Sequence, residues 1–314
     1  MKKRYHILIT IIISVAAFIF CPLIYLTPAF DYNLFIEKNI NAKFKEQIKK
    51  DNLILNKKEN EIRIMTYNLL AHYDSWGGKP VLTRKDDFFT LRDGYLPDVL
   101  GLQEMCSDWY SEINKNKSSY KFVTPLKTAF PQKMTAILYN SDTIEVIDSG
   151  NRSFSNNINF KARRIVWAVF KSKATNDVFL VINTHFSFLK PSQKSDNYTA
   201  QACQVNELYN TLQNLYYQYP YPIFVIGDFN TKKQSSYKTS IINTGSYGIL
   251  NSFLTDAEKD AKNKYSGENF SFKNTLNDHI FIYGDIRVRN LALLSQDYFS
   301  KISDHYPLLA DFSL

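Results

Sequence analysis

Residues 223–230 have the sequence IFVIGDFN, in which four apolar residues and a glycine lead directly to Asp228 and Asn230. A short apolar run rich in β-branched and aromatic residues is typical of a buried β-strand. Burying a carboxylate beside such a strand costs free energy unless a partner or a metal compensates. The polar end of this strand is therefore a candidate functional site.

The same pattern recurs at five other strand ends, which are residues 64–68 (IMTYN), 98–104 (DVLGLQE), 181–185 (VINTH), 277–279 (NDH) and 303–305 (SDH). Any one of them alone is best interpreted as a turn former, and a lone histidine is more often structural than a ligand. Together the clusters contain three of the five histidines of the chain. Six coincidences of this kind predict one convergent site.

Short β-type runs divided by polar loops continue from residue 61 to the C-terminus. The predicted strands are Ile62–Tyr67, Asp98–Leu102, Thr135–Tyr139, Ile165–Phe170, Val178–Asn183, Ile223–Ile226, His279–Ile282 and Leu308–Phe312. Predicted helices are Arg84–Tyr95 and Thr199–Tyr219, the second stopped by two nearby prolines. Many strands with few helices, neither strictly alternating nor segregated, indicate two sheets packed face to face with helices outside.

The N-terminus has a different composition. A basic MKKR sequence precedes the apolar run Ile7–Leu26, and about 20 apolar residues suffice for a helix to span a bilayer. The basic flank predicts that the N-terminus stays cytoplasmic and the remainder is exported. A cleaved signal peptide, which would give a secreted protein, is the alternative. We expect an anchor or signal segment at residues 1–30, a polar stalk at 31–60 and one folded domain at 61–314.

Charge and cysteine content set few limits on function. The net charge is +8, but residues 1–60 hold ten Lys and Arg against five Asp and Glu, which leaves only +3 for the domain. So small an excess says little about a polyanionic substrate. Cys21, Cys106 and Cys203 are too few and too scattered for a disulfide framework or a zinc site.

The residue types at the strand ends fit metal-assisted hydrolysis of phosphate esters. Oxygen ligands without cysteine suit Mg²⁺, or alternatively Mn²⁺. Such hydrolysis requires charge neutralisation, an oriented water, and cationic or amide groups around the transition state. The sequence has no glycine-rich phosphate loop followed by Lys-Ser/Thr and no Gly-x-Ser-x-Gly elbow, which argues against nucleotide-driven transfer and against a serine esterase.

These six motifs, in this order over residues 61–314, resemble the endonuclease/exonuclease/phosphatase superfamily, which includes pancreatic deoxyribonuclease, neutral sphingomyelinases and inositol polyphosphate 5-phosphatases. The resemblance implies an α/β fold, a four-layer sandwich of two packed mixed β-sheets flanked by helices, here preceded by one N-terminal hydrophobic helix. It also implies that Glu104 is the principal metal ligand, with Asn68 beside it and Asp304 completing the site.

The same resemblance implies roles for the remaining groups. Asp228 would orient or deprotonate the attacking water, and Asn230 would hold a phosphate oxygen. His305 would contact the phosphate while Asp278 orients it; a buried carboxylate raises the pKa of an imidazole. His185 resembles a second histidine that donates a proton or contacts phosphate.

Two departures and one addition affect this interpretation. His279 stands where the family often has Tyr, and the Glu that pairs with the histidine matching His185 in the nuclease branch is not found in this sequence. Arg163 or Arg164 is a candidate substrate-binding cation, with an exposed solvated pair as the alternative.

Three functions remain open on the sequence. The first is a monomeric phosphodiesterase or nuclease, held at the membrane by a single span with its domain on the non-cytoplasmic side. The second has the same chemistry on a phospholipid headgroup, as in sphingomyelinases and phosphoinositide phosphatases. The third is a non-catalytic binding module, against which the intact set of polar residues argues.

Overall fold

The computed structural model describes residues 46, 56–71, 79–123, 134–155, 163–188, 194–231, 246–266, 276–296 and 298–314. The predicted anchor at residues 1–30, and all of the predicted stalk except residues 46 and 56–60, lie outside this part of the chain. Within it, no helix combines the length and the apolar character that crossing a bilayer requires.

Two mixed β-sheets form the centre of the described part of the chain. The first contains, in spatial order, β10 (Asn263–Ser266), β12 (Arg287–Leu293), β13 (Leu308–Ser313), β1 (Ile62–Asn68), β2 (Val99–Met105), β4 (Met134–Asn140) and β3 (Tyr120–Phe122). The second contains β5 (Ile144–Ser153), β6 (Arg164–Ser172), β7 (Val178–His185), β8 (Ile223–Asp228), β11 (Asp278–Tyr283) and β9 (Thr255–Asp256). All eight predicted strands are present, and the other five complete the sheets.

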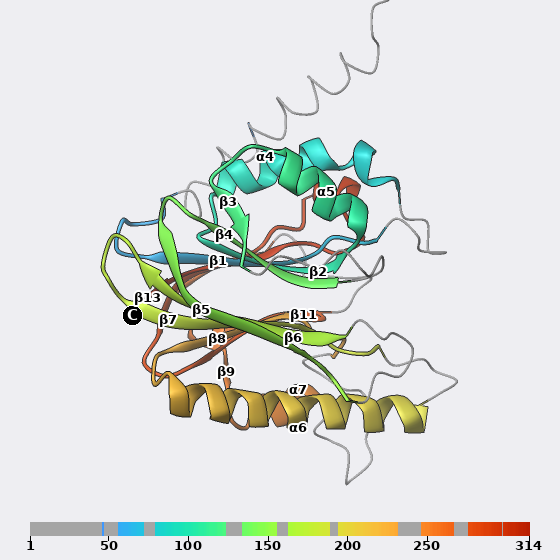
Figure 1. Ribbon diagram of the computed structural model, residues 1–314, viewed down its shortest axis with the longest axis vertical. Helices are drawn as coiled ribbons and strands as arrows, with labels where there is room; N and C mark the ends of the chain where they lie inside the picture. Colours follow the sequence, from blue (N-terminus) through green and yellow to red (C-terminus); the bar gives the residue numbers. More distant parts are fainter. Residues whose placement is uncertain are drawn as a thin grey trace, which may run out of the picture. The chain divides into compact units, whose positions relative to one another are not determined.

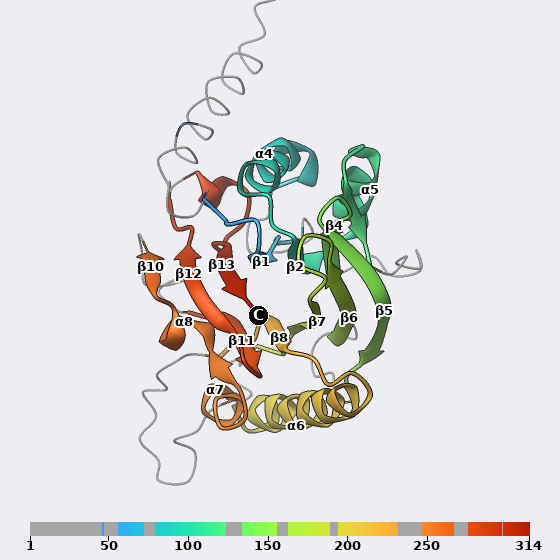
Figure 2. The same ribbon diagram turned by 90° about the vertical axis from the view of Figure 1, so that its left-hand side faces the viewer.

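The sheets pack face to face with helices on their outer faces (Figure 1). Helices α4 (Lys85–Tyr95) and α5 (Ser107–Lys115) cover the first sheet, whereas α6 (Lys194–Gln218) and α7 (Ser246–Leu250) cover the second. The view turned by 90° shows the same succession of layers (Figure 2), and the short α8 (Ala257–Asp260) lies beside β11 and β12. The predicted four-layer sandwich is confirmed, as are both predicted helices.

The core explains why the central strands are apolar almost throughout. Every residue of β1 and β8 is buried, because each strand has the opposite sheet on one face and helices on the other. Between the sheets, the rings of Phe224 and Phe312 lie 4.7 Å apart. A second apolar cluster joins the outer face of the second sheet to α6 through Val205, Leu208 and Leu212.

Strand register brings the polar strand ends together. β1 runs parallel to β2 with Asn68 opposite Gln103, and β7 runs parallel to β8 with His185 opposite Asp228. The antiparallel strand β11 begins with Asp278 opposite Asp228. We call the end of the sandwich at which β1, β2, β7 and β8 finish the carboxyl end, and the opposite end the amino end.

Gly227 permits the close approach of β8 to β7 just before Asp228. Its φ of +148° is a backbone conformation that residues with a side chain rarely adopt, and a Cβ there would lie 2.0 Å from the Thr184 carbonyl oxygen. Only glycine fits both conditions. The glycine of the IFVIGDFN stretch therefore serves to align His185 with Asp228.

Candidate active site

Asp228 is the centre of the polar cluster at the carboxyl end. Its Oδ2 accepts a hydrogen bond from Asn68 Nδ2 at 3.0 Å and lies 3.2 Å from His185 Nε2 and 3.8 Å from His305 Nε2. Burial raises the pKa of Asp228, but the two imidazoles and the backbone N–H of Asn230 outweigh burial and hold it well below the usual range. Asp228 is therefore an anion shared between two histidines.

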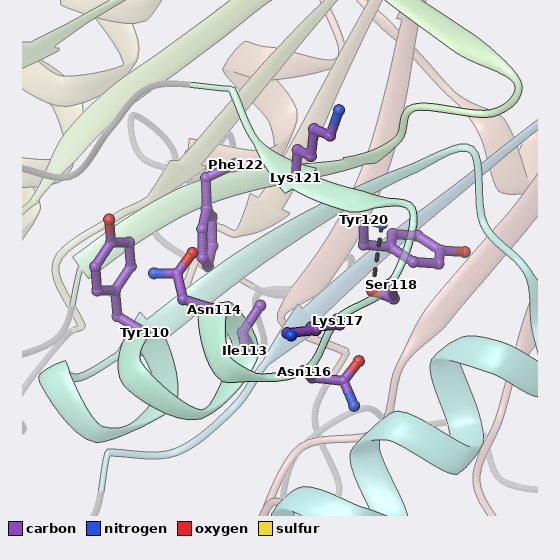
Figure 3. Close-up of a pocket in the computed structure, with 9 residues that line it drawn as sticks. All are labelled: Tyr110, Ile113, Asn114, Asn116, Lys117, Ser118, Tyr120, Lys121 and Phe122. Atoms are coloured by element: carbon purple, nitrogen blue, oxygen red, sulfur yellow. Dashed lines mark hydrogen bonds between the residues drawn. The ribbon is translucent and has the colours of Figure 1, made fainter.

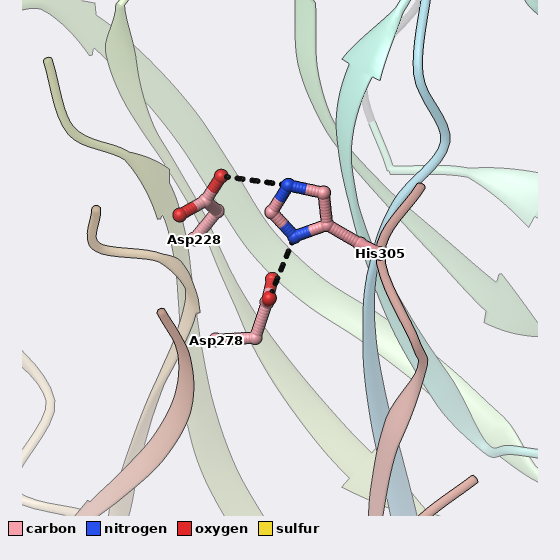
Figure 4. Close-up of side chains that lie close together, drawn as sticks. All are labelled: Asp228, Asp278 and His305. Atoms are coloured by element: carbon pink, nitrogen blue, oxygen red, sulfur yellow. Dashed lines mark hydrogen bonds and ion pairs between the residues drawn. The ribbon is translucent and has the colours of Figure 1, made fainter. Parts of the chain in front are cut away.

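His305 is held by a second carboxylate. Its Nδ1 lies 2.7 Å from Asp278 Oδ2, and its Nε2 points towards Asp228 (Figure 4). Burial lowers the pKa of His305, but the charges of Asp278, Asp228 and Asp304 together raise it to about 10. At neutral pH His305 is a cation with both ring nitrogens protonated.

His185 has the opposite protonation state. The side chain is buried, and its Nε2 lies 3.2 Å from Asp228 and 3.2 Å from Asn230 Nδ2. Burial and the nearby Arg163 lower the pKa of His185, and the Asp228 charge offsets them only in part. One neutral and one cationic histidine thus flank a single carboxylate, a separation of pKa values typical of acid–base sites. The groups that contact His185 are Asp228 and Asn230, where the nuclease branch of the family has a Glu.

Asn230 is fixed by its backbone and its amide. Its backbone N–H donates to Asp228 Oδ1 at 2.9 Å, and its Nδ2 donates to the Phe186 carbonyl at 3.0 Å. Its φ of +48° is a left-handed conformation that asparagine tolerates better than most residues. Leu70 and Glu104 at this end also have positive φ, which fits the clustering of backbone strain at functional sites.

Each of the three predicted metal ligands lies at the carboxyl end, near this cluster. Ala71 N lies 3.5 Å from Glu104 Oε2, and the Ser303 hydroxyl donates to the Asn68 carbonyl at 2.6 Å. Asp304 follows Ser303 and, like Glu104, is only partly buried. The pairing of β2 with β4 has a register shift between Leu102 and Met105. Glu104 lies within this irregularity, so its side chain does not follow the regular alternation of the strand.

The tightest group of potential metal ligands among the described residues differs from the predicted set. Ligand atoms of Asp228, Asp278 and His305 all lie within 4.8 Å of one another. His305, however, already faces both of these carboxylates through its two ring nitrogens, with Nδ1 2.7 Å from Asp278 and Nε2 3.8 Å from Asp228. The partly exposed carboxylates of Glu104 and Asp304 are the oxygen donors that a hard cation prefers, so they fit a divalent metal better.

The two candidate arginines, Arg163 just before β6 and Arg164 at its first position, have different surroundings. Arg163, at 1% exposure, is close enough to Glu104 and Asp228 to interact with their charges. Burial lowers the pKa of its guanidinium, and these two carboxylates oppose that shift. Arg164 instead donates to the Ser153 hydroxyl at 3.3 Å, in a solvent-exposed contact. The structure therefore places Arg163, and not Arg164, beside the cluster.

The model of the endonuclease/exonuclease/phosphatase family matches residues 65–305. The chain belongs to this family. A family member from Bacteroides vulgatus has a similar crystal structure, with a TM-score of 0.67 and 22% identity over 81% of this chain and 99% of that one. No curated protein matches the chain in sequence.

Two further structures with the family fold have more specific names. One is a mannosyl-6-phosphatase of Bacteroides thetaiotaomicron, with a TM-score of 0.66 and 20% identity over 81% of this chain and 100% of that one. The other is the human Nocturnin catalytic domain with bound sulfate, with a TM-score of 0.61 and 21% identity over 82% of this chain and 94% of that one. At these identities the likeness shows the shared fold.

Sequence reasoning missed two residues that hold this family site in place. The Arg84 guanidinium donates to the carbonyls of Leu69 and Leu70 at 2.6 and 2.7 Å and to that of Ile302 at 2.6 Å. It thereby ties the loop after Asn68 to the loop before Asp304. Asn183 bridges the sheets by donating to the Leu102 and Ala136 carbonyls at 3.1 and 2.7 Å. Only the polar character of Asn183 within an apolar strand signalled its role.

A groove of about 380 Å³ lies elsewhere on the domain (Figure 3). Tyr110 and Ile113 of α5 form one wall, and Tyr120 and Phe122 of β3 form the other. None of the predicted site residues lines it. The chemistry of the polar cluster therefore does not depend on this groove.

Proposed function

We propose that this chain hydrolyses phosphate esters with the aid of a divalent cation, Mg²⁺ or Mn²⁺. One observation carries the proposal: Asp228 is a buried anion between a neutral His185 and a cationic His305. Such an arrangement can hold a proton acceptor and a positive charge within one pocket, as attack of water on a phosphate ester requires.

Each group has a defined part in the proposed mechanism. Asp228 accepts a hydrogen bond from the attacking water, and the proton that the water loses passes to the Asp228–His185 pair. His305 and the Asn230 amide face the non-bridging phosphate oxygens, on which negative charge accumulates. As the new bond from water oxygen to phosphorus forms, the bond from phosphorus to the leaving oxygen breaks. Asp278 keeps His305 oriented and protonated.

Glu104 and Asp304, with Asn68 beside them, would hold the cation. When bound, a divalent cation supplies charge neutralisation at the phosphate oxygens. Arg163 would add a second, fixed positive charge from the opposite side of Asp228. A non-catalytic binding module would not need this set of acid, base and cation in one pocket.

The test is a substrate panel with the purified full-length chain in detergent. It comprises bis-p-nitrophenyl phosphate, p-nitrophenyl phosphate, plasmid DNA, mannose 6-phosphate, sphingomyelin and phosphoinositides. We expect turnover of at least one phosphate ester, abolished by EDTA and restored by Mg²⁺ or Mn²⁺. Folded protein that is inactive on every substrate would refute the proposal, and activity indifferent to chelation would remove the metal from it.

We also propose that residues 7–26 anchor the chain as a single span, with the domain on the non-cytoplasmic side. The apolar run, its basic flank and its length support this location. Protease added to intact cells or spheroplasts is expected to degrade the domain. Full protection of the domain would contradict export, and release of active protein free of the N-terminal segment would favour a cleaved signal.

A further inference from the structure

The first described segment of the domain, residues 56–61, is fixed to the amino end of the sandwich. Lys57 Nζ binds both carboxylate oxygens of the buried Asp98, at 2.8 and 2.6 Å. Arg289 donates to the Asn56 carbonyl at 2.8 Å. The chain that precedes residue 56 therefore meets the domain at its amino end.

The candidate active site lies at the other end of the same strands. β1 begins at Ile62, beside this segment, and finishes at Asn68 in the site. Seven residues that rise about 3.3 Å each separate the two ends by about 20 Å. Glu104, His185 and Asp228 lie at the same end as Asn68.

Three exposed tyrosine side chains lie at the amino end. The segment 216–221 has the sequence YYQYPY, and Tyr217 is 92% exposed, while Tyr216 and Tyr221 are each 37% exposed. The segment belongs to the amino end because it joins the end of α6 to the start of β8.

Neighbouring residues show that residues 216–221 and the start of the domain lie at the same end. Phe224, at the start of β8, packs on Phe312, which is the register partner of Ile62 at the start of β1. Leu96, which precedes the Asp98 that holds Lys57, is a further exposed apolar residue at this end. The start of the domain and the exposed tyrosines therefore share one surface, made of residues 56–61, Leu96 and residues 216–221, which we call the amino face.

We propose that the amino face rests on the lipid bilayer that holds the N-terminal segment, so that the active site opens towards water. Tyrosine rings are amphipathic and are enriched at membrane–water interfaces. The exposed charges at this end balance, with Lys58 and Arg287 beside Glu59 and Asp285, so the tyrosine rings rather than net charge support this contact. The occupant of this surface is thus a lipid headgroup layer, and the inference rests on the proposed anchoring of residues 7–26.

This orientation limits which phosphate esters can reach the proposed active site. A site about 20 Å above the headgroups, at the opposite end of the strands, cannot reach the phosphates of the bilayer on which the domain rests. Water-soluble phosphate esters, nucleic acid among them, reach it freely. The amino face therefore favours a soluble substrate over the lipids of the same membrane.

Tryptophan quenching by brominated lipid tests the orientation. The full-length chain is reconstituted into phosphatidylcholine–phosphatidylglycerol vesicles, with and without dibrominated phosphatidylcholine, which quenches indole emission only at close range. Tyr217→Trp reports on the amino face. Leu82→Trp is the matched control, because Leu82 is 64% exposed and precedes Arg84, which binds the loops of the carboxyl end. The parent chain supplies the background emission.

We expect brominated lipid to remove most of the emission added by Tyr217→Trp and little of that added by Leu82→Trp. Equal quenching of both, stronger quenching at Leu82, or failure of the chain to float with the vesicles would overturn the orientation.

The same vesicles separate this inference from the proposed function. Hydrolysis of added bis-p-nitrophenyl phosphate is measured beside loss of the vesicle phospholipids, and only the former is expected. Hydrolysis of the lipids of the same vesicles at a comparable rate would overturn the orientation. Absence of all hydrolysis, with the quenching contrast intact, would instead reject the proposed function and leave the orientation standing.

Discussion

The buried carboxylate of Asp256 provides a stability measurement that the structure makes quantitative. Its Oδ2 accepts a hydrogen bond from the Tyr247 hydroxyl at 2.7 Å and lies 3.6 Å from His279 Nδ1. Its Oδ1 accepts from the backbone N–H of Glu258 at 2.9 Å and so caps α8. Asp256→Asn keeps the shape and the capping oxygen but removes the charge.

The magnitude follows from the pKa of Asp256. Burial raises this pKa, but His279, Tyr247 and the Glu258 N–H together lower it from 3.8 to about 2. A lowering of this size corresponds to about 2 kcal/mol of stability. Because the folded pKa is the lower one, this contribution is fully present above the unfolded pKa of 3.8 and is lost as the pH falls from there through 2.

Urea unfolding of wild type and Asp256→Asn at a series of pH values measures the effect. At pH 7 the variant is expected to be less stable by about 2 kcal/mol with an unchanged m-value. Below pH 3.8 the gap should narrow, and near pH 2 it should be small. Asp260→Asn, at an exposed position of the same helix, is the control and should change stability by no more than about 0.5 kcal/mol. A gap that stays constant across the whole pH range would refute the reasoning.

Three further predictions concern activity. Asp228→Ala and His305→Ala should each lower turnover by several orders of magnitude in folded protein; a variant that keeps more than about a tenth of the rate, about 1.4 kcal/mol in barrier, would contradict its role. Burial lowers the pKa of His305, and the charge of Asp278 contributes most to raising it to about 10. Asp278→Asn removes that charge. The fall of kcat/KM at high pH should therefore shift to lower pH, towards the ordinary histidine pKa of about 6.5. If this fall does not shift, it does not report the deprotonation of His305. Arg163→Gln should lower kcat/KM by about tenfold or more, consistent with loss of one charged hydrogen bond, and the control Arg164→Gln should leave it nearly unchanged; equal effects would reject the assignment of Arg163.

The strands predicted from the sequence are those buried on both faces or lined by continuous apolar residues, such as β1 and β8. The missed strands lie at sheet edges or carry irregularities. β5 has the sequence IEVIDSGNRS, which is too polar to signal a strand, and its pairing with β6 decides its conformation. β12 contains a register shift near Asn290 that interrupts the alternation of buried and exposed residues. These elements depend on tertiary pairing that a local pattern does not encode.

The site shows a similar division. Residue types at strand ends predicted which groups would meet, because the carboxyl ends of neighbouring parallel strands lie at one edge of a sheet. The raised pKa of His305 followed from its predicted pairing with Asp278, which the structure shows. The lowered pKa of His185 was out of reach, because it depends on burial and on Arg163, which is distant in the chain, lying beside the imidazole. The choice between Arg163 and Arg164 likewise needed the structure, because Arg163 precedes β6 and its contacts do not follow from the alternation of that strand.

From the charges at the carboxyl end we predict a preference for a phosphate diester over a monoester as substrate. Among the described residues, four carboxylates and three cations interact there, namely Glu104, Asp228, Asp278 and Asp304 with Arg84, Arg163 and His305. With His185 neutral, they leave a single net negative charge. Buried charge is costly unless it is balanced. A divalent cation together with a singly charged diester would neutralise this pocket, whereas a dianionic monoester would leave one negative charge uncompensated. The comparison of bis-p-nitrophenyl phosphate with p-nitrophenyl phosphate decides the point, and preference for the monoester would mean that one of these groups carries a different charge from the one assigned to it.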